Sequence, residues 1–142
     1  MEIERKYLIK ALPDLGSFDY YDIEQAYISR SPVIRVRRAG SEYWLTVKGR
    51  GMMVREELNL PLTAESYLHL LRKTEGTVIR KRRYLIPYGA YTIELDLFKS
   101  PREGLYMAEV EFPNEDEARS FAAPDWFGRE VTDDPDYHNS NM

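Results

Sequence analysis

The stretch Tyr91–Phe98 reads YTIELDLF, and its alternation of apolar and polar side chains is typical of a β-strand. In a β-strand, side chains two residues apart lie on the same face of the sheet. Ile93 and Leu95 therefore share one face, and Glu94 and Asp96 share the opposite one. Two carboxylates on one face repel each other, and nothing in sheet stability favours such a pair. The stretch predicts a strand with one apolar face and one face whose charge serves another purpose.

Similar short runs recur along the chain, each bounded by Gly, Pro, Ser or Asn. The expected strands are Glu2–Lys10, Asp22–Arg30, Val33–Ala39, Glu42–Lys48, Met53–Leu60, Thr77–Ile86, Tyr91–Phe98 and Leu105–Phe112. Short connections favour antiparallel neighbours, and about eight antiparallel strands can close into a barrel wide enough for one small ligand. We therefore expect a mostly β protein of the α+β class: an eight-stranded antiparallel closed β-barrel, or tunnel, with helices packed outside.

Two stretches depart from the strand period. Thr63–Thr74 carries apolar residues at helical spacing after a threonine N-cap, and Asn114–Phe121 opens with a capping pattern. A short turn of helix is expected around Asp125–Phe127. The polar tail Asp133–Met142 is expected to be extended or loosely ordered.

The composition excludes several classes of function. The 142 residues fit one domain over 1–142, and there is no cysteine for a disulfide, a thiol nucleophile or a Cys-based metal site. Because His69 and His138 are the only histidines, any metal must be held by oxygen ligands. A net charge of −4 argues against a nucleic-acid binder. No apolar stretch fits a signal sequence or a membrane span, so we expect a cytoplasmic protein.

Charged side chains gather on one face of most expected strands. The basic members are Lys6, Arg35, Arg37, Lys48, Arg55, Lys81 and Arg83, and the acidic members are Glu2, Glu4, Glu57, Glu94, Asp96, Glu109 and Glu111. Doubled carboxylates are what a hard divalent cation needs, and doubled Arg and Lys are what a chain of phosphates needs. If these faces point inward the barrel is a charged tunnel; the alternative is an ordinary sheet with one solvated face. On the sixth strand basic residues run from Arg80 to Arg83, so periodicity cannot choose the face, and we take Lys81 and Arg83 as inward.

The order of these motifs resembles the CYTH superfamily, the triphosphate tunnel metalloenzymes. Glu2, Glu4 and Lys6 match its ExExK signature. The later motifs follow in the family's order: Arg35 and Arg37, Lys48 before a glycine, Arg55 and Glu57, Lys81 and Arg83, Glu94 and Asp96, then Glu109 and Glu111. The ending Tyr137–Asn141 is similar to the tail of short bacterial members.

The resemblance implies a tunnel that binds triphosphate with Mg²⁺ or Mn²⁺, and it implies a role for each matching residue. The implied metal ligands are Glu2, Glu4, Glu109 and Glu111, with Glu94 and Asp96 as further candidates. The implied phosphate-binding residues are Arg35, Arg37, Lys48, Arg55, Lys81 and Arg83. Lys6 would lie near the scissile phosphate as a catalytic residue, with Tyr27 beside it and Glu4 nearby. Asn59 stands where the family is often acidic.

We therefore expect metal-dependent hydrolysis of inorganic triphosphate to pyrophosphate and phosphate. Lys6 either stabilises developing charge or helps to activate water. The enzymatic alternatives are a nucleotide or thiamine triphosphatase and a class IV adenylyl cyclase-like activity, for which Trp44 offers a stacking surface. The non-enzymatic alternative is a polyphosphate-binding module. The expected partner is a small-molecule triphosphate, with no nucleic acid and no membrane, and the protein is expected to be a monomer or a homodimer.

Overall fold

One curved antiparallel sheet dominates the computed structural model, which describes residues 1–142. Its strands are β1 (Glu2–Ile9), β2 (Asp19–Arg30), β3 (Val33–Ala39), β4 (Glu42–Lys48), β5 (Val54–Arg55), β6 (Glu57–Leu62), β7 (Glu75–Tyr88), β8 (Tyr91–Ser100), β9 (Tyr106–Glu111) and β10 (Phe127–Glu130). The order across the sheet is β10-β1-β9-β8-β7-β2-β3-β4-β6. The expected antiparallel β architecture is therefore confirmed.

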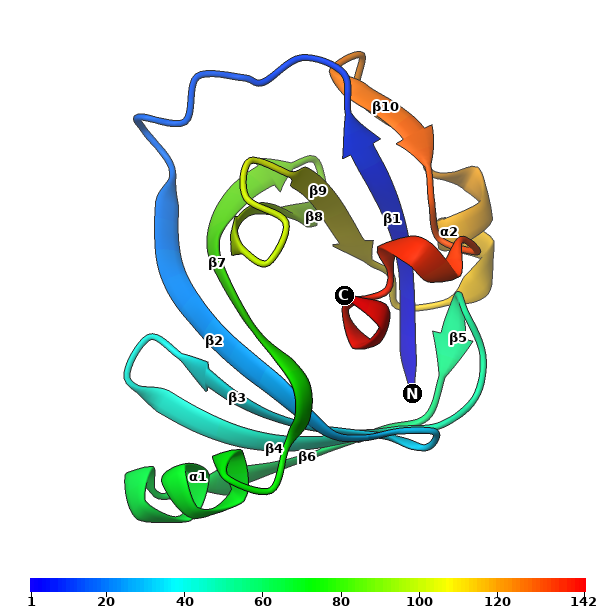
Figure 1. The fold of residues 1–142 in the computed structure, drawn as a ribbon. Coiled ribbons are helices and arrows are strands. Elements are labelled where there is room, and N and C mark those ends of the chain that lie inside the picture. The colour runs from blue at the N-terminus through cyan, green and yellow to red at the C-terminus, as the bar shows by residue number, and fades with distance from the viewer.

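The sheet curls until its two ends meet at β1 (Figure 1). β6 pairs with β4, and β5, separated from β6 by Glu56 alone, pairs with the start of β1. The strand expected at Met53–Leu60 is thus broken into two parts that join opposite ends of the sheet. The other half of that β1 edge is taken by β10, so the barrel is nearly closed. Without β10, and with β5 and β6 counted as one broken strand, the wall has the expected eight strands.

The main apolar core lies outside the barrel wall, between the sheet and the C-terminal segment. It includes Tyr7, Leu95, Val110 and Phe127, and Phe121 packs against it. The helix α2 (Glu115–Ser120) and β10 cover this face, and the Asn114 side chain caps α2 by accepting the N–H of Glu117. The fold is therefore stabilised largely from its outer surface.

The turn of helix expected around Asp125–Phe127 is reduced to one hydrogen-bonded turn, in which the Phe127 N–H donates to the Pro124 carbonyl at 3.1 Å, and Phe127 itself begins β10. Its ring packs 4.7 Å from that of Tyr7, centroid to centroid, and the strand pairs with the otherwise open edge of β1. An unpaired strand edge exposes backbone donors and acceptors, so pairing and burial together outweigh a helical turn.

The helix α1 (Ala64–Leu71) covers the outer face of the β3–β4–β6 region. Thr63 caps it by accepting the N–H of Ser66. Tyr67 anchors it, since this side chain is buried with its ring 5.1 Å from that of Tyr43. No helix is both long enough and apolar enough to cross a membrane.

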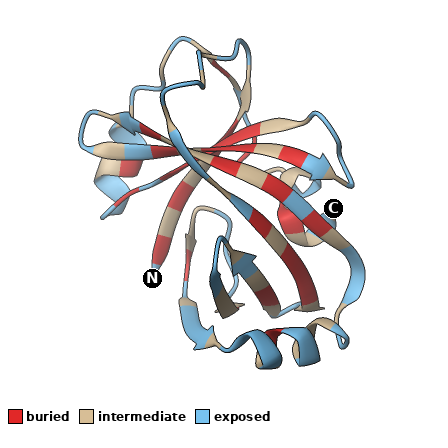
Figure 2. Cartoon of the chain, turned by 90° about the vertical axis from the view of Figure 1, so that its left-hand side faces the viewer, coloured by how far each residue is buried: buried red, intermediate tan, exposed pale blue.

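The barrel interior has a charged layer above an apolar floor. Figure 2 shows the banding of buried and exposed residues that strand alternation produces. A second buried cluster fills one end of the interior: Tyr27, Ile79, Phe98, Met107 and Val131. Three of them lie on strands two positions from a charged residue of the same face: Ile79 beside Lys81, Phe98 beside Asp96 and Met107 beside Glu109. The charged cavity therefore lies next to an apolar cluster inside the same barrel.

The tail is ordered, which corrects the expectation for Asp133–Met142. It forms two short 3₁₀ turns, η1 (Pro135–Tyr137) and η2 (Asn139–Asn141), and crosses the barrel interior in Figure 1. Tyr137 and Met142 pack against the apolar floor. Burial of these side chains overrides the polar composition that pointed to a loose end.

Candidate active site in the barrel

The charged faces of the strands line one cavity of about 660 Å³ inside the barrel. Of the predicted site residues, those that line it are Glu2, Glu4, Lys6, Tyr27, Arg35, Arg37, Lys48, Arg55, Arg83, Glu94, Glu109 and Glu111. They come from β1 to β5 and β7 to β9, so residues far apart in the sequence meet at one place. The alternative of a sheet with a solvated charged face is thereby excluded.

The basic run on β7 divides between the two faces of the wall. Lys81 and Arg83 point into the barrel and are buried. Arg80 and Arg82 lie on the outside, where they pair with Glu24 and Asp22 of β2. The inward choice made for Lys81 and Arg83 is therefore the one that the structure adopts.

Lys81 and Asp96 do not reach the cavity, which does not fit the predicted roles of phosphate and metal ligand. Lys81 Nζ lies 2.7 Å from Asp96 Oδ2, and both side chains are fully buried. Arg83 completes the group by donating to both Asp96 oxygens, at 2.8 and 2.9 Å. Both side chains point inward as expected, but they lie at the level of the apolar cluster. There Lys81 and Asp96 form an ion pair, and Asp96 accepts hydrogen bonds from Arg83.

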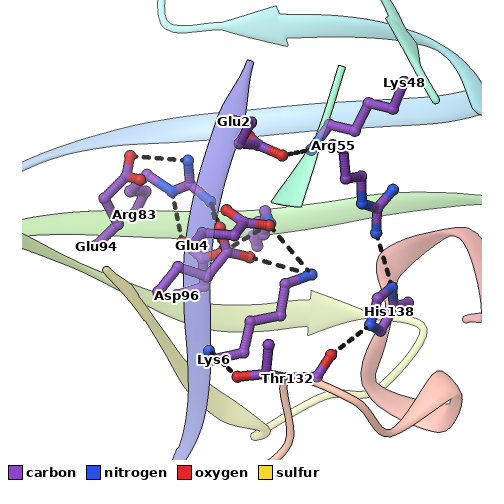
Figure 3. Close-up of polar contacts among 12 residues, drawn as sticks. Glu2, Glu4, Lys6, Lys48, Arg55, Arg83, Glu94, Asp96, Thr132 and His138 are labelled. Atoms are coloured by element: carbon purple, nitrogen blue, oxygen red, sulfur yellow. Dashed lines mark hydrogen bonds and ion pairs between the residues drawn. The ribbon is translucent and has the colours of Figure 1, made fainter. Parts of the chain in front are cut away.

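The Lys6 ammonium group points toward Glu4 (Figure 3). Its Nζ lies 3.8 Å from a carboxylate oxygen of Glu4 and 3.8 Å from one of Glu109. Burial, followed by repulsion from Glu109, raises the pKa of Glu4. Although burial opposes it, the charges of Lys6 and Arg83 hold the pKa of Glu109 well below its usual range.

Lys48 forms ion pairs with both Glu2 and Glu57. Lys48 Nζ lies 2.9 Å from Glu2 and 3.5 Å from Glu57. Burial and the nearby Glu4 raise the pKa of Glu2 to about 8, and a hydrogen bond with Glu57 adds to the rise. Burial, then Glu94 and further carboxylates, also raise the pKa of Glu111. Crowded carboxylates thus keep one another from ionising freely.

The acidic side chains have the chemistry of a hard divalent cation site. As they stand, no three of them lie close enough to form a ready coordination shell. Their donor set nevertheless fits such a cation, because each is an oxygen ligand and because three of them, Glu2, Glu4 and Glu111, have raised pKa values that a bound cation would relieve. Strand register supports the grouping, with Glu4 opposite Glu111 on β9.

Three arginines form the basic side, and none of them pairs with a carboxylate within 4.0 Å. Arg35 donates to Thr46 Oγ1 at 3.2 Å, and Arg37 donates to Gln25 Oε1 at 2.7 Å. Arg55 donates to His138 Nδ1 at 2.9 Å. Burial and the nearby Arg35 lower the pKa of Arg37 to about 10, a sign of crowded positive charge.

Sequence reasoning missed His138, Gln25 and Thr46. His138 lies on the tail, lines the cavity with Asn139 and Ser140, and contacts Arg55 (Figure 3). The resemblance of the ending Tyr137–Asn141 to the tail of short bacterial members was the only sequence signal here, and it implied no role for His138. Strand alternation, however, places Gln25 on the same face as Tyr27, and Thr46 on the same face as Lys48. The inward orientation of Gln25 and Thr46 could therefore have been predicted.

The mouth of the cavity has a different lining. Tyr21, Trp44 and Glu42 line it with the turn Ala39–Ser41, and Arg37 lies opposite Trp44 in the sheet register. Trp44 Nε1 donates to Glu42 at 3.4 Å. Trp44 therefore lines the cavity rather than serving only to pack the wall.

Comparison with known proteins agrees with this geometry. The CYTH domain family matches residues 1–137. The inorganic triphosphatase of Nitrosomonas europaea is 38% identical over 146 residues, covering 99% of this chain and 95% of that protein. The inorganic triphosphatase of Acetivibrio thermocellus is 37% identical over 147 residues, covering 99% and 92%.

Solved structures have the same architecture. A crystal structure of an inorganic triphosphatase superposes with a TM-score of 0.72 at 34% identity, covering 99% of this chain and 93% of the other. A protein of Pyrococcus horikoshii gives a TM-score of 0.66 at 21% identity, covering 84% of each chain. At that identity the second likeness shows the fold alone.

Proposed function

The chain belongs to the CYTH family, and from this we propose that it hydrolyses inorganic triphosphate to pyrophosphate and phosphate inside the barrel. Both curated relatives named above are inorganic triphosphatases, and each is matched over nearly its full length. The proposal also has a physical basis in the cavity, which separates positive from negative side chains.

The observation that carries the proposal is the set of arginines without carboxylate partners. Arg35 and Arg55 are buried, Arg37 lines the same cavity, and each meets only a neutral acceptor. Burying a charge without compensation is costly, so such an arrangement implies an anion that supplies the missing charge. Triphosphate carries about four to five negative charges, and guanidinium groups bind phosphate oxygens in pairs.

The carboxylates opposite the arginines would be repelled by a phosphate chain unless a cation lay between them. We assign Glu2, Glu4, Glu109 and Glu111 to a divalent cation, Mg²⁺ or Mn²⁺, with Glu94 at its edge. When bound, the cation neutralises phosphate charge and raises the electrophilicity of phosphorus.

The protein's own residues hold and orient the substrate. Arg35, Arg37 and Arg55 bind the phosphates that become pyrophosphate and stabilise the charge that develops on this leaving group. Water attacks the terminal phosphorus in line, the bond to the bridging oxygen breaks, and the proton from water passes to solvent. We assign Lys6 to stabilising charge at the reacting phosphate, because its Nζ lies 3.8 Å from both Glu4 and Glu109, where the cation would be held. Tyr27 lines the cavity beside this region.

An organic triphosphate is the second candidate substrate, and one feature favours it. The mouth of the cavity presents Tyr21 and Trp44, which could stack on an aromatic group. Arg37 and Arg83 lie opposite Trp44 and Tyr21 in the sheet register, so the rings are not separated from the basic side chains of the cavity. Because both curated relatives named above are inorganic triphosphatases, we rank inorganic triphosphate first.

The test is a phosphate-release assay on triphosphate, ATP and thiamine triphosphate, with Mg²⁺, Mn²⁺ or EDTA in parallel. We expect rapid hydrolysis of triphosphate that depends on the cation. Product analysis for cyclic AMP covers the cyclase alternative. Tight triphosphate binding with no phosphate release under any cation would leave a polyphosphate-binding module and overturn the proposed function.

A further inference from the structure

The basic residues inside the barrel, which are buried or half-buried, fall into two groups with different partners. Lys6, Lys48, Lys81 and Arg83 each pair with at least one carboxylate within 4.0 Å. Arg35, Arg37 and Arg55 each donate to one neutral side chain: Thr46, Gln25 and His138, respectively. The division is not explained by burial, because members of both groups are buried.

We propose that Gln25, Thr46 and His138 are positioning residues that fix the three arginines through neutral acceptors and so leave their positive charge for the triphosphate. The inference rests on the proposed function and adds a specific requirement to it. A carboxylate in any of these places would orient the guanidinium equally well but would cancel the charge that the substrate must meet.

Gln25 gives the sharpest case. Its side chain is fully buried on β2, its Oε1 accepts from Arg37, and its Nε2 has no hydrogen-bond partner. A glutamate of the same shape would make a stronger, charge-assisted bond to Arg37 and would leave no buried donor unsatisfied. Stability alone would therefore favour glutamate at this position. The amide is consistent with a function that needs Arg37 uncompensated.

Thr46 separates Arg35 from an acidic residue that stands close by. Its hydroxyl accepts from Arg35 and donates to Asn59 Oδ1 at 2.6 Å, and Asn59 Nδ2 donates to Glu57 at 2.8 Å. Two neutral side chains thus stand between the guanidinium and the carboxylate. The relay orients Arg35 without bringing Glu57 into an ion pair with it.

His138 acts in its neutral form, and its tautomer follows from its partners. Arginine only donates hydrogen bonds, so Nδ1 must accept from Arg55. Nε2 then carries the proton and donates to the carbonyl of Thr132, 2.9 Å away. Both ring nitrogens are occupied, and the tail thereby holds Arg55 in the cavity.

The first experiment compares isosteric variants of Gln25 by calorimetric binding of inorganic triphosphate, in EDTA and with Ca²⁺ replacing Mg²⁺, after a check that neither condition releases phosphate. Gln25→Glu keeps the acceptor and adds a charge, whereas Gln25→Met removes the acceptor and adds none. The matched control is Ser17→Asp, which adds the same charge at an exposed position outside the cavity. We expect Gln25→Glu to weaken binding about tenfold or more, Gln25→Met to weaken it less, and Ser17→Asp to leave it within about twofold.

Two results would overturn the inference. If Gln25→Glu binds triphosphate as tightly as the wild type, the neutrality of the acceptor is irrelevant. If Gln25→Met binds triphosphate as tightly as the wild type, Gln25 does not position Arg37. Neither result would refute the proposed function, because that function is tested by phosphate release by the wild type. Conversely, a wild type that binds triphosphate without releasing phosphate would refute the proposed function and leave this inference standing.

A second set of variants decides the matter should the buried Gln25 variants fail to fold, which thermal melting would reveal. His138→Phe removes the acceptor, and His138→Asn places an amide oxygen near the position of Nδ1. We expect His138→Phe to raise KM for triphosphate about tenfold with kcat within about threefold, and His138→Asn to restore KM. In an Arg55→Met background, His138→Phe should have no further effect. An equal effect in both backgrounds would reduce His138 to packing and refute its positioning role.

Discussion

Replacing Arg35 by methionine should make the ligand-free protein more stable, although it removes a group that binds substrate. Arg35 is buried, has no carboxylate partner, and leaves its Nε without a hydrogen bond. Exchange of buried ionic groups for apolar residues of similar size often stabilises a protein by about 1–4 kcal/mol. Because this guanidinium borders a cavity of about 660 Å³ and not a packed core, we expect the low end, about 1–2 kcal/mol.

Arg83→Met is the matched control, since it removes the same group from a paired site. Arg83 donates twice to Asp96 and once to Glu94, at 2.8, 2.9 and 3.0 Å. Its loss would leave the fully buried Asp96 with Lys81 alone. Removing one partner from a buried ion pair costs about 3–5 kcal/mol. The two substitutions should therefore shift stability in opposite directions.

Thermal and urea denaturation in EDTA would measure both effects. For a chain of this size about 1 kcal/mol corresponds to a Tm change of roughly 3–4 °C, so Arg35→Met should melt about 3–8 °C higher and Arg83→Met about 10 °C or more lower. Saturating triphosphate with Mg²⁺ should then raise the Tm of the wild type, as a ligand at about a hundredfold excess over Kd contributes about 2.7 kcal/mol. Arg35→Met should respond much less. A lower Tm for ligand-free Arg35→Met would refute the reasoning that its charge is uncompensated.

Three further predictions concern metal, pH and substrate. Excess EDTA should abolish phosphate release, and Glu111→Gln should nearly do so with the melting curve preserved; full activity in EDTA would exclude the metal mechanism. Folding raises the pKa of Glu2 from 4.5 to about 8, so the folded protein binds the Glu2 proton more tightly than the unfolded chain does. The Tm in EDTA should therefore fall as the pH rises from about 5 to 8. Removing the carboxyl by Glu2→Gln should flatten that slope, and an unchanged slope would contradict the assignment. For substrate, kcat/KM for triphosphate should exceed that for ATP at least about a hundredfold, equivalent to about 2.7 kcal/mol, with pyrophosphate a poor substrate; comparable rates on ATP would favour the organic triphosphate.

Strand periodicity explains why so much of the site could be predicted from the sequence. A period of two fixes which side chains share a face, so Glu109 and Glu111, or Arg35 and Arg37, had to point the same way once their strands formed. Periodicity does not give depth along the barrel axis. Asp96 obeys the same rule as its neighbours and yet lies beneath the cavity, because that depth depends on strand tilt and register.

The structure of the C-terminal segment could not be predicted from local sequence patterns. A polar tail and a short apolar run near Phe127 have no period of their own, and their structure depends on which edge and which opening of the barrel remain uncovered. β10 exists because β1 has an edge to fill, and His138 is buried because the interior accepts it. Both are tertiary effects, and the sequence signal for them is correspondingly weak.

The position of the apolar core explains how this fold tolerates a charged interior. Most globular proteins are stabilised by what they bury inside, but here the main cluster lies between the outer wall and the C-terminal segment, around Tyr7 and Val110. The charged layer of the interior, above the second apolar cluster, is thereby less needed for stability and can hold guanidinium groups that lack counter-charges. The same C-terminal segment serves both sides of the wall, because Phe127 covers the outer core while His138 holds Arg55 within. Stability and substrate binding are thus divided between the two faces of one sheet, and the tail is the element that joins them.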